Sequence, residues 1–361
     1  MLTQTFFNER NQMMKYTLSR KMLIISIICL SPISSAQADK KLYVVDVYGT
    51  NEVTSKQIEN KFKKELTVLA TSGVGASLPA EKQAAFNKAL NTINQSLQST
   101  RNYTLFNIAP ITFSNDSTCY ITFDYIKTSD LAMLKQTWLP KPTQHIPDLS
   151  KLIYEWHKYF YLANDLIFAK KVKIEVKTCP AHHCMFGFDH PLLEKYKIIF
   201  DQAEKHKVNL VKIMREDSDG EKRAAVIFIL GHIKNRDELI KLILPSLNDS
   251  NSSVRNNVLR TLIYLAQKDK NIHLPLDKIF YETGFPIVTE RNKALYVISA
   301  LADNPTNAKL IKHAIGKQLI DNLKLQQPSN HNPAYEVLKK ISGKNYGERD
   351  YQAWEKYLRS F

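Results

Sequence analysis

The chain has 361 residues, of which 44% are hydrophobic and 24% are charged. This balance excludes a wholly disordered or collagen-like chain, and it is enough for two globular domains of ordinary size. Lys and Arg number 50 against 35 Asp and Glu, and the resulting formal net charge of +15 suggests an anionic partner.

Residues 1–38 have the three parts of a secretory signal. A basic segment at 15–21 precedes an apolar run from Met22 to Leu30, and small residues follow up to Ala38. The apolar run is shorter than the roughly 20 residues that span a bilayer. We therefore expect cleavage after Ala38, an exported chain in the periplasm or outside the cell, and no transmembrane span in the mature protein.

Residues 39–139 are predicted to form a small α/β unit. A β-rich run at 42–48 is followed by two amphipathic helices and then by strands at 103–113 and 118–127. Thr54 and Gln57 have the spacing of a capping box at the first helix. The helices carry apolar residues at a spacing of three to four, namely Ile58, Phe62, Leu66 and Leu69 in the first and Phe86, Leu90, Ile93 and Leu97 in the second.

This β-α-α-β-β order, with a strand that enters a turn at Gly49–Asn51, resembles the POTRA-like modules of envelope proteins. The resemblance implies a domain that docks onto other proteins. In the last strand Cys119 shares one face with Ile121, Phe123 and Tyr125. We expect a buried thiol there, and pairing of Cys119 with Cys179 or Cys184 stays open.

Prolines punctuate residues 140–148, and neither a helix nor a central strand tolerates them. We interpret this stretch as a linker between domains. Beyond it the pattern is helical, beginning with an entry region at 149–215 that has one helix near 149–169 and another from Pro191.

The densest cluster of reactive side chains lies in this entry region. Two cysteines enclose two adjacent histidines, and a third histidine follows; the residues are Cys179, His182, His183, Cys184 and His190. In an oxidising compartment a Cys179–Cys184 disulfide is the simplest interpretation. Free thiols and a zinc site are the alternatives, although two adjacent histidines cannot easily face one ion.

Three similar segments recur in the region 216–361. Each places a polar helix start before an arginine and an apolar helix after it, and the arginines are 32 and 36 residues apart. Repeated helix pairs at such a period indicate an α-solenoid. The segments are 219–225, 251–257 and 288–294, and their arginines are Arg223, Arg255 and Arg291.

The segment Asn251-Ser252-Ser253-Val254-Arg255 resembles the Asp-x-x-Val-Arg helix start of the HEAT-repeat family, and the resemblance extends over about 191–358. A glycine turn at 342–347 and a helix around Trp354 look like the tail that follows bacterial HEAT-like repeats, which would serve as a terminal cap. The expected fold is therefore α+β, a small β-α-α-β-β domain followed by an all-α superhelical solenoid.

The repeat arginines have two interpretations. The family resemblance implies that each pairs with an acidic or backbone group of the neighbouring repeat and holds the stack in register. Alternatively, the three would line one surface and bind an anion. We favour the first interpretation.

No local pattern of a nucleophile, a phosphate loop or a cofactor site is present, so we expect no cofactor and no catalytic residues. The leading hypothesis is a non-enzymatic exported scaffold that binds a protein partner. One alternative is a binder of anionic polymers, because most of the excess basic charge falls in residues 151–361; an acidic envelope surface suits an exported chain, whereas chromosomal nucleic acid does not. The other is an enzyme that uses the Cys179–Cys184 region with a metal or, like certain HEAT-like proteins, as a chromophore lyase.

Overall fold

The computed structural model describes residues 42–72, 79–113, 117–168, 171, 181–182 and 192–360. The predicted signal segment and Cys179, His183, Cys184 and His190 lie outside these residues.

A three-stranded sheet forms the centre of the N-terminal unit. The strands β1 (Tyr43–Tyr48), β2 (Tyr103–Thr112) and β3 (Cys119–Lys127) are ordered β1-β3-β2. β1 runs parallel to β3, and β2 pairs with it antiparallel as a hairpin. All three strands are where the sequence predicts them, which confirms the β-α-α-β-β order.

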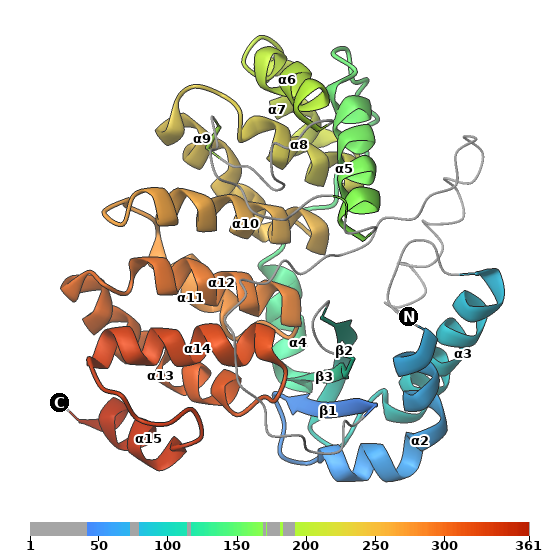
Figure 1. Cartoon of the computed structure of the whole chain (residues 1–361), viewed down its shortest axis with the longest axis vertical. Coiled ribbons are helices and arrows are strands. Elements are labelled where there is room, and N and C mark those ends of the chain that lie inside the picture. Colours follow the sequence, from blue (N-terminus) through green and yellow to red (C-terminus); the bar gives the residue numbers. More distant parts are fainter. Residues whose placement is uncertain are drawn as a thin grey trace.

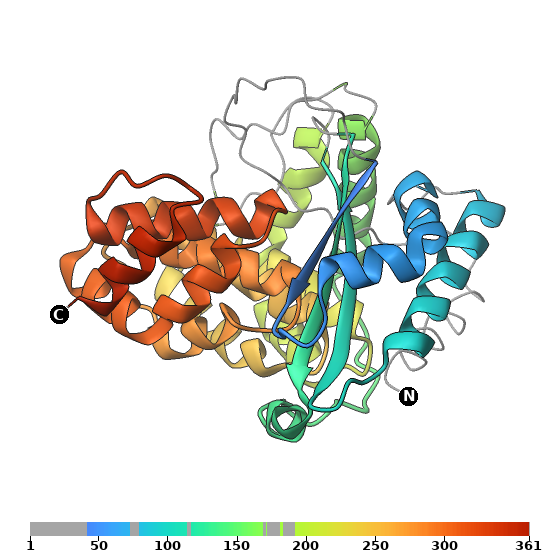
Figure 2. The ribbon, with the colours of Figure 1, turned by 90° about the horizontal axis from the view of Figure 1, so that it is seen from below.

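Helices α2 (Ser55–Ser72) and α3 (Ala80–Leu97) cover one face of this sheet, and the solenoid lies on the other (Figure 2). The predicted capping box opens α2, since the Gln57 amide donates to Thr54 Oγ1 and the Thr54 amide to Gln57 Oε1. Cys119 is buried in the core between sheet and helices, as expected. The resemblance to POTRA-like modules stays a prediction.

Helix α4 (Thr128–Gln136) follows β3 directly and was not predicted. Only Leu134 of its apolar residues is buried, while Met133 is 60% exposed. A helix without an apolar stripe gives no periodic signal in the sequence.

The rest of the chain is helical, and the expected solenoid is confirmed (Figure 1). An inner row is formed by α8, α10, α12 and α14, each of which packs against the next, and outer helices precede them in the chain. The helices are α5 (Leu152–Phe168), α6 (Leu192–Ala203), α7 (Lys207–Glu216), α8 (Gly220–Leu230), α9 (Arg236–Ile243), the 3-10 helix η2 (Leu244–Asn248), α10 (Ser252–Lys268), α11 (Leu276–Glu282), α12 (Val288–Leu301), α13 (Pro305–Leu323), α14 (Pro328–Ser342) and α15 (Tyr351–Arg359).

Side-chain caps set many of these helix starts. An Asn or Asp at the N-cap accepts hydrogen bonds from backbone N–H groups of the first turn, which would otherwise lack partners. This occurs at α8, α9, α10, α13 and α15, through Asp219, Asn235, Asn251, Asn304 and Asp350. Local sequence therefore specifies where each of these helices begins.

The first inner helix, α8, is buried on more than one side. In α8 every residue from Arg223 to Leu230 is buried, which is typical of a helix enclosed by neighbours. Trp156 of α5 stacks on Phe228 of α8 with ring centroids 4.9 Å apart. Helix α8 is therefore enclosed by other parts of the same chain.

Residues 138–147, which we call the strap, join the sheet unit to α5. They have no regular secondary structure beyond one bridge, Gln144 with Asp217, as the prolines predict. The strap nevertheless packs along the solenoid. The Leu139 amide donates to Asn248 O at 2.7 Å, and the Ile146 amide to Asp217 Oδ2 at 2.8 Å. The strap thus binds the first repeats rather than acting as a free spacer.

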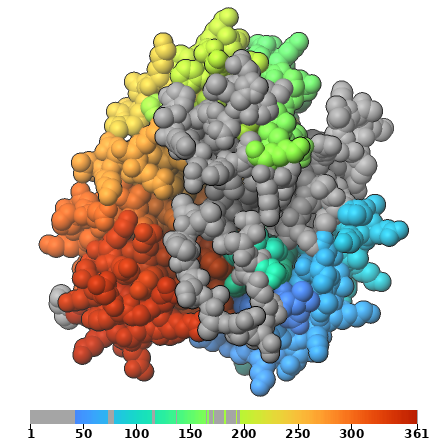
Figure 3. Space-filling model, in the orientation of Figure 1, coloured from blue at the N-terminus to red at the C-terminus, as the bar shows by residue number. Residues whose placement is uncertain are grey.

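The N-terminal unit and the last helices lie at the same end of the molecule, and the α5–α9 region lies at the other (Figures 1 and 3). In the described part of the chain, no helix combines the length and the apolar character that a membrane crossing requires.

Candidate functional site

The repeat arginines Arg223, Arg255 and Arg291 are buried at the starts of inner helices, with 1%, 2% and 0% exposure. Each donates from Nη1 to the backbone carbonyl six residues earlier, at 2.7, 2.6 and 2.8 Å. That carbonyl lies just beyond the end of the preceding outer helix. The same contact therefore fixes the turn between outer and inner helix in each repeat.

Two of these arginines also bind the next repeat. Arg223 forms a bidentate pair with Asp249 at 2.7 and 2.9 Å, and Arg255 forms one with Glu290 at 2.8 and 2.9 Å. Asp249 serves twice, because its backbone carbonyl accepts from Arg255. Bidentate charge-assisted bonds have a fixed geometry, so these pairs link successive repeats. We call Arg223, Arg255, Arg291 and their acidic partners the arginine ladder.

The third arginine, Arg291, pairs with an aspartate of the sheet. Arg291 Nη2 lies 2.8 Å from Asp124 Oδ1 on β3, and both side chains are fully buried. Arg291 Nε donates to Asn322 of α13 at 3.2 Å, and the guanidinium lies 3.7 Å from the centroid of the Tyr48 ring. Asn322 is uncharged and cannot neutralise Arg291. The sheet therefore supplies the carboxylate that completes the ladder.

A second acidic side chain of the sheet caps the last inner helix. Asp46 on β1 is 4% exposed, and it accepts from the amides of Gln326 and Gln327 at 3.0 and 2.9 Å. These residues precede α14, which has no side-chain cap of its own. An acid at a helix N-terminus satisfies free N–H groups and complements the helix dipole. β1 and α14 are thereby joined.

Sequence reasoning missed Asp46 and Asp124. A signal was present, because aspartate is depleted in strands, yet both lie within strands among β-branched and aromatic residues. An aspartate inside a predicted strand indicates that its side of the sheet contacts hydrogen-bond donors or basic side chains of another element.

Of the predicted Cys and His cluster the structure describes His182 alone. Its amide donates to Gly231 O at 3.0 Å, its Nε2 lies 3.2 Å from Lys234 O, and burial lowers the pKa of the ring. In the part of the chain that the structure describes, no three His, Cys, Asp or Glu side chains form a metal-binding group. The Cys179–Cys184 disulfide stays a prediction.

A pair of buried acidic side chains adjoins the ladder. Glu282 at the end of α11 is 3% exposed and lies beside Glu290, the partner of Arg255. Burial and the Glu290 carboxylate together raise the pKa of Glu282 well above its usual range, while Arg255 opposes the shift. Glu282 therefore keeps its proton to a higher pH in the folded protein than an exposed glutamate does.

Glu282→Gln is expected to stabilise the protein by an amount that grows with pH. A carboxyl with a raised folded pKa contributes stability that is fully present below its unfolded pKa of about 4.3 and is lost as pH rises through the folded pKa. Glutamine stays uncharged at every pH, so the stability advantage of the variant should grow as Glu282 ionises in the wild type. It should reach about 1–3 kcal/mol, the cost of leaving a buried polar group without a partner. Urea unfolding at several pH values between 5 and 9 measures this, with the exposed Glu81→Gln as control. A difference that does not change with pH would contradict the assignment.

Exposed apolar side chains mark the seam where sheet unit, strap and solenoid meet. Met133 of α4, Leu139 of the strap and Tyr281 of α11 are 60%, 45% and 47% exposed. Thr137 lies among them: its amide donates to Met133 O at 3.3 Å, and its side chain hydrogen-bonds the Tyr281 hydroxyl. We call Met133, Leu139 and Tyr281 the seam surface. Its three parts are held together by the ladder and the strap.

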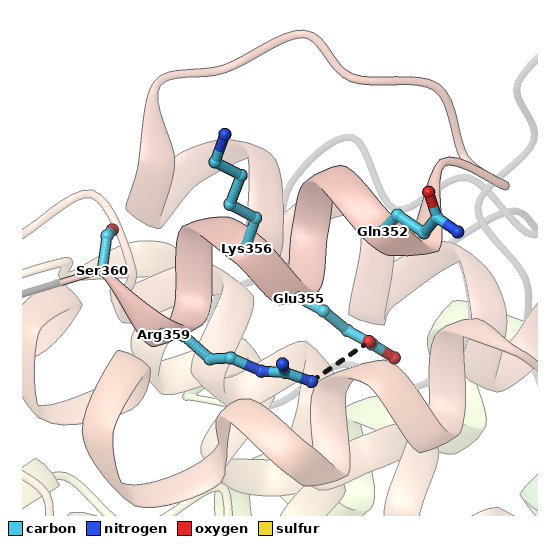
Figure 4. Close-up of a pocket in the computed structure, with 5 residues that line it drawn as sticks. All are labelled: Gln352, Glu355, Lys356, Arg359 and Ser360. Carbon is cyan, nitrogen blue, oxygen red and sulfur yellow. Dashed lines mark hydrogen bonds and ion pairs between the residues drawn. The ribbon is translucent and has the colours of Figure 1, made fainter.

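Two shallow depressions lie elsewhere on the described surface. One runs along α15 and is lined by polar or charged side chains, with Glu355 and Arg359 paired at 3.5 Å (Figure 4). In Figure 4 Lys356 points away from that pair. The other lies at the end of the sheet beside Glu52 and Arg101. Polar and charged side chains line both depressions.

A family profile described as HEAT repeats matches residues 208–271, which include α8, α9 and α10. A search of curated proteins finds no match. One solved structure, titled "Kap95p Binding Induces the Switch Loops of RanGDP to adopt the GTP-bound Conformation: Implications for Nuclear Import Complex Assembly Dynamics", matches 84% of this chain and 39% of its own, with 11% identity and a TM-score of 0.36. A similarity this low says nothing about partners. Residues 208–271 thus match HEAT repeats, and the stacked helix pairs show that the helical part of this protein has a HEAT-like α-solenoid fold.

Proposed function

We propose that the protein is an exported, non-enzymatic scaffold that binds a partner protein in the periplasm or cell envelope through the seam surface. HEAT repeats suggest a protein-interaction scaffold, and the signal-like segment before residue 39 motivates the compartment. The observation that carries the proposal is that Met133, Leu139 and Tyr281 are exposed from three different parts of the chain.

The composition of the seam surface suits a protein partner. Tyr and Met are enriched in protein interfaces, because they bury much area and adapt to the opposing surface. The Tyr281 ring is already ordered, since its centroid lies 6.1 Å from that of Phe285 in an edge-on contact and its hydroxyl is hydrogen-bonded to the Thr137 side chain. Little conformational entropy is lost when an ordered side chain binds.

A photo-crosslinking residue at position 133 is expected to capture a defined protein in the periplasmic fraction, identified by mass spectrometry. The matched control is position 310, because Leu310 on α13 is 50% exposed and lies outside the seam. Tyr281→Glu should reduce capture from position 133 at least about tenfold, since it places a charge in an apolar contact. Equal products from positions 133 and 310, or capture unaffected by Tyr281→Glu, would contradict the proposal.

The proposal that the protein is not a metal enzyme is tested separately. Metal analysis and thiol counting on the purified protein should find no stoichiometric metal. Stoichiometric zinc that is lost on mutation of Cys179 and Cys184 would instead support the metal-enzyme alternative.

A further inference from the structure

The two ends of the solenoid differ in the residues that they expose. Terminal repeats need a polar outer face to stay soluble. At the C-terminal end α15 buries Trp354 and exposes Gln352, Lys356 and Arg359. The opposite end, formed by α5 to α7, holds half of the exposed large apolar side chains found in the described part of the chain, namely Leu149, Tyr154, Ile198, Phe200 and Val208. Among the described residues, that end therefore exposes apolar side chains where a polar cap would otherwise lie.

The most exposed of these side chains are held close together. Leu149 is 73% exposed and Val208 is 84% exposed. Asn209, the neighbour of Val208, accepts from the Leu149 amide and donates to Pro147 O, both at 3.2 Å. The turn at Leu149 is fixed by Asp148, whose carboxylate accepts from Ser150 and from the Ile153 amide at 3.0 Å. Leu149 thus projects from a rigid turn.

Basic side chains surround these apolar ones. Lys212 and Arg215 follow Val208 at i+4 and i+7, so all three share the exposed face of α7. Lys151 is exposed in the same turn as Leu149 and has a φ of 59°, a strained value for a residue with a side chain. In the part of the chain that the structure describes, no ion pair involves Lys151, Lys212 or Arg215.

On α5 the same combination recurs. Lys158 lies 5.0 Å from the centroid of the Tyr154 ring, and Tyr154 is 59% exposed. Lys158 also pairs with Glu155 at 3.1 Å. Acidic side chains also lie at this end, among them the exposed Asp201 of α6, so Lys151, Lys212 and Arg215 form a local basic patch around Leu149 and Val208.

We propose that this basic-apolar end (Leu149, Lys151, Tyr154, Val208, Lys212 and Arg215) binds an anionic lipid surface. Protruding apolar side chains with a basic rim suit the headgroup region of a membrane, where the apolar tips insert and the cations meet lipid phosphates. A second copy of this end would be repelled by its like charge. The end-on arrangement would leave the seam surface and α15 accessible, and it does not depend on the proposed partner protein.

The test is co-sedimentation of the purified protein with vesicles. Wild type should bind vesicles of phosphatidylcholine with phosphatidylglycerol, bind pure phosphatidylcholine weakly, and be released as NaCl is raised, because salt screens charge. The double variant Val208→Glu with Lys212→Glu should bind the anionic vesicles at least about tenfold more weakly, since each basic charge near such a surface contributes substantially to binding.

The matched control is Leu310→Glu with Lys309→Glu, which makes the same changes on the exposed side of α13. It should bind within about twofold of wild type, and both variants should keep the wild-type circular dichroism and Tm because their sites are exposed. Equal loss in both double variants, equal binding to neutral vesicles, or no binding to anionic vesicles would overturn the proposal. The last result would leave an acidic protein as the ligand of this end.

Discussion

Arg291→Met is expected to lower the free energy of unfolding by about 3–5 kcal/mol, because it leaves the Asp124 carboxylate buried without a counter-charge. Both side chains are fully buried and 2.8 Å apart. The substitution also removes the donors to Phe285 O and Asn322. Asp124→Asn should cost a similar amount, since it leaves the Arg291 guanidinium uncompensated.

The double variant Asp124→Asn with Arg291→Met distinguishes the coupling between the two side chains from the separate effects of the two substitutions. It should lose less than the sum of the single losses, with a coupling of about 1–3 kcal/mol, because no buried charge is left unpaired. The exposed pair Lys317–Asp321 is the control, and breaking it should change stability by less than about 0.5 kcal/mol. Urea unfolding followed by circular dichroism measures all four variants. Additive losses in the double variant would show that the pair is not coupled.

Trp354→Ala should destabilise the protein by about 3–5 kcal/mol, the usual cost of removing a large buried ring. Trp354 is fully buried, packs edge-on against Tyr335 and Tyr346, and donates from Nε1 to Gly347 O at 2.9 Å. A terminal cap covers the apolar face of the last repeat. Hydrogen exchange should therefore increase first in α13 and α14 and later in α5.

The control for the cap is Lys356→Ala on the exposed side of the same helix, which should change stability by less than about 0.5 kcal/mol. Trp354→Phe should lie between wild type and Trp354→Ala, because it keeps part of the ring. If α5 loses protection as early as α14, the Trp354 helix does not act as a local cap.

Much of this fold could be predicted because its signals are local. Alternating apolar residues gave the three strands, the 3–4 spacing gave α2 and α3, and the recurrence around Arg223, Arg255 and Arg291 indicated the solenoid. Helix α4 was missed since it has no apolar stripe. The prolines of the strap predicted the absence of a helix, but its packing on Asn248 and Asp217 depends on hydrogen bonds between distant segments.

The candidate site was harder to predict for the same reason. The family resemblance suggested the pairing of the arginines, yet the partner of Arg291 comes from a strand far earlier in the chain and follows no repeat period. Exposure of Met133, Tyr281 or Val208 depends on which neighbours cover them, and an apolar residue in the sequence is more often in the core. Of the Cys179–Cys184 region, the densest reactive cluster in the sequence, only Ala181 and His182 are among the described residues.

The central claim is that the sheet unit completes the arginine ladder, so that the N-terminal unit and the last repeats unfold together. Native-state hydrogen exchange in increasing urea tests it directly by comparing amides of β1 and β3 with those of α12 and α14. The account predicts that the two sets share one opening free energy in wild type, and that Arg291→Met lowers it for both. Sheet amides that open at a separate, lower free energy, unchanged by Arg291→Met, would contradict it.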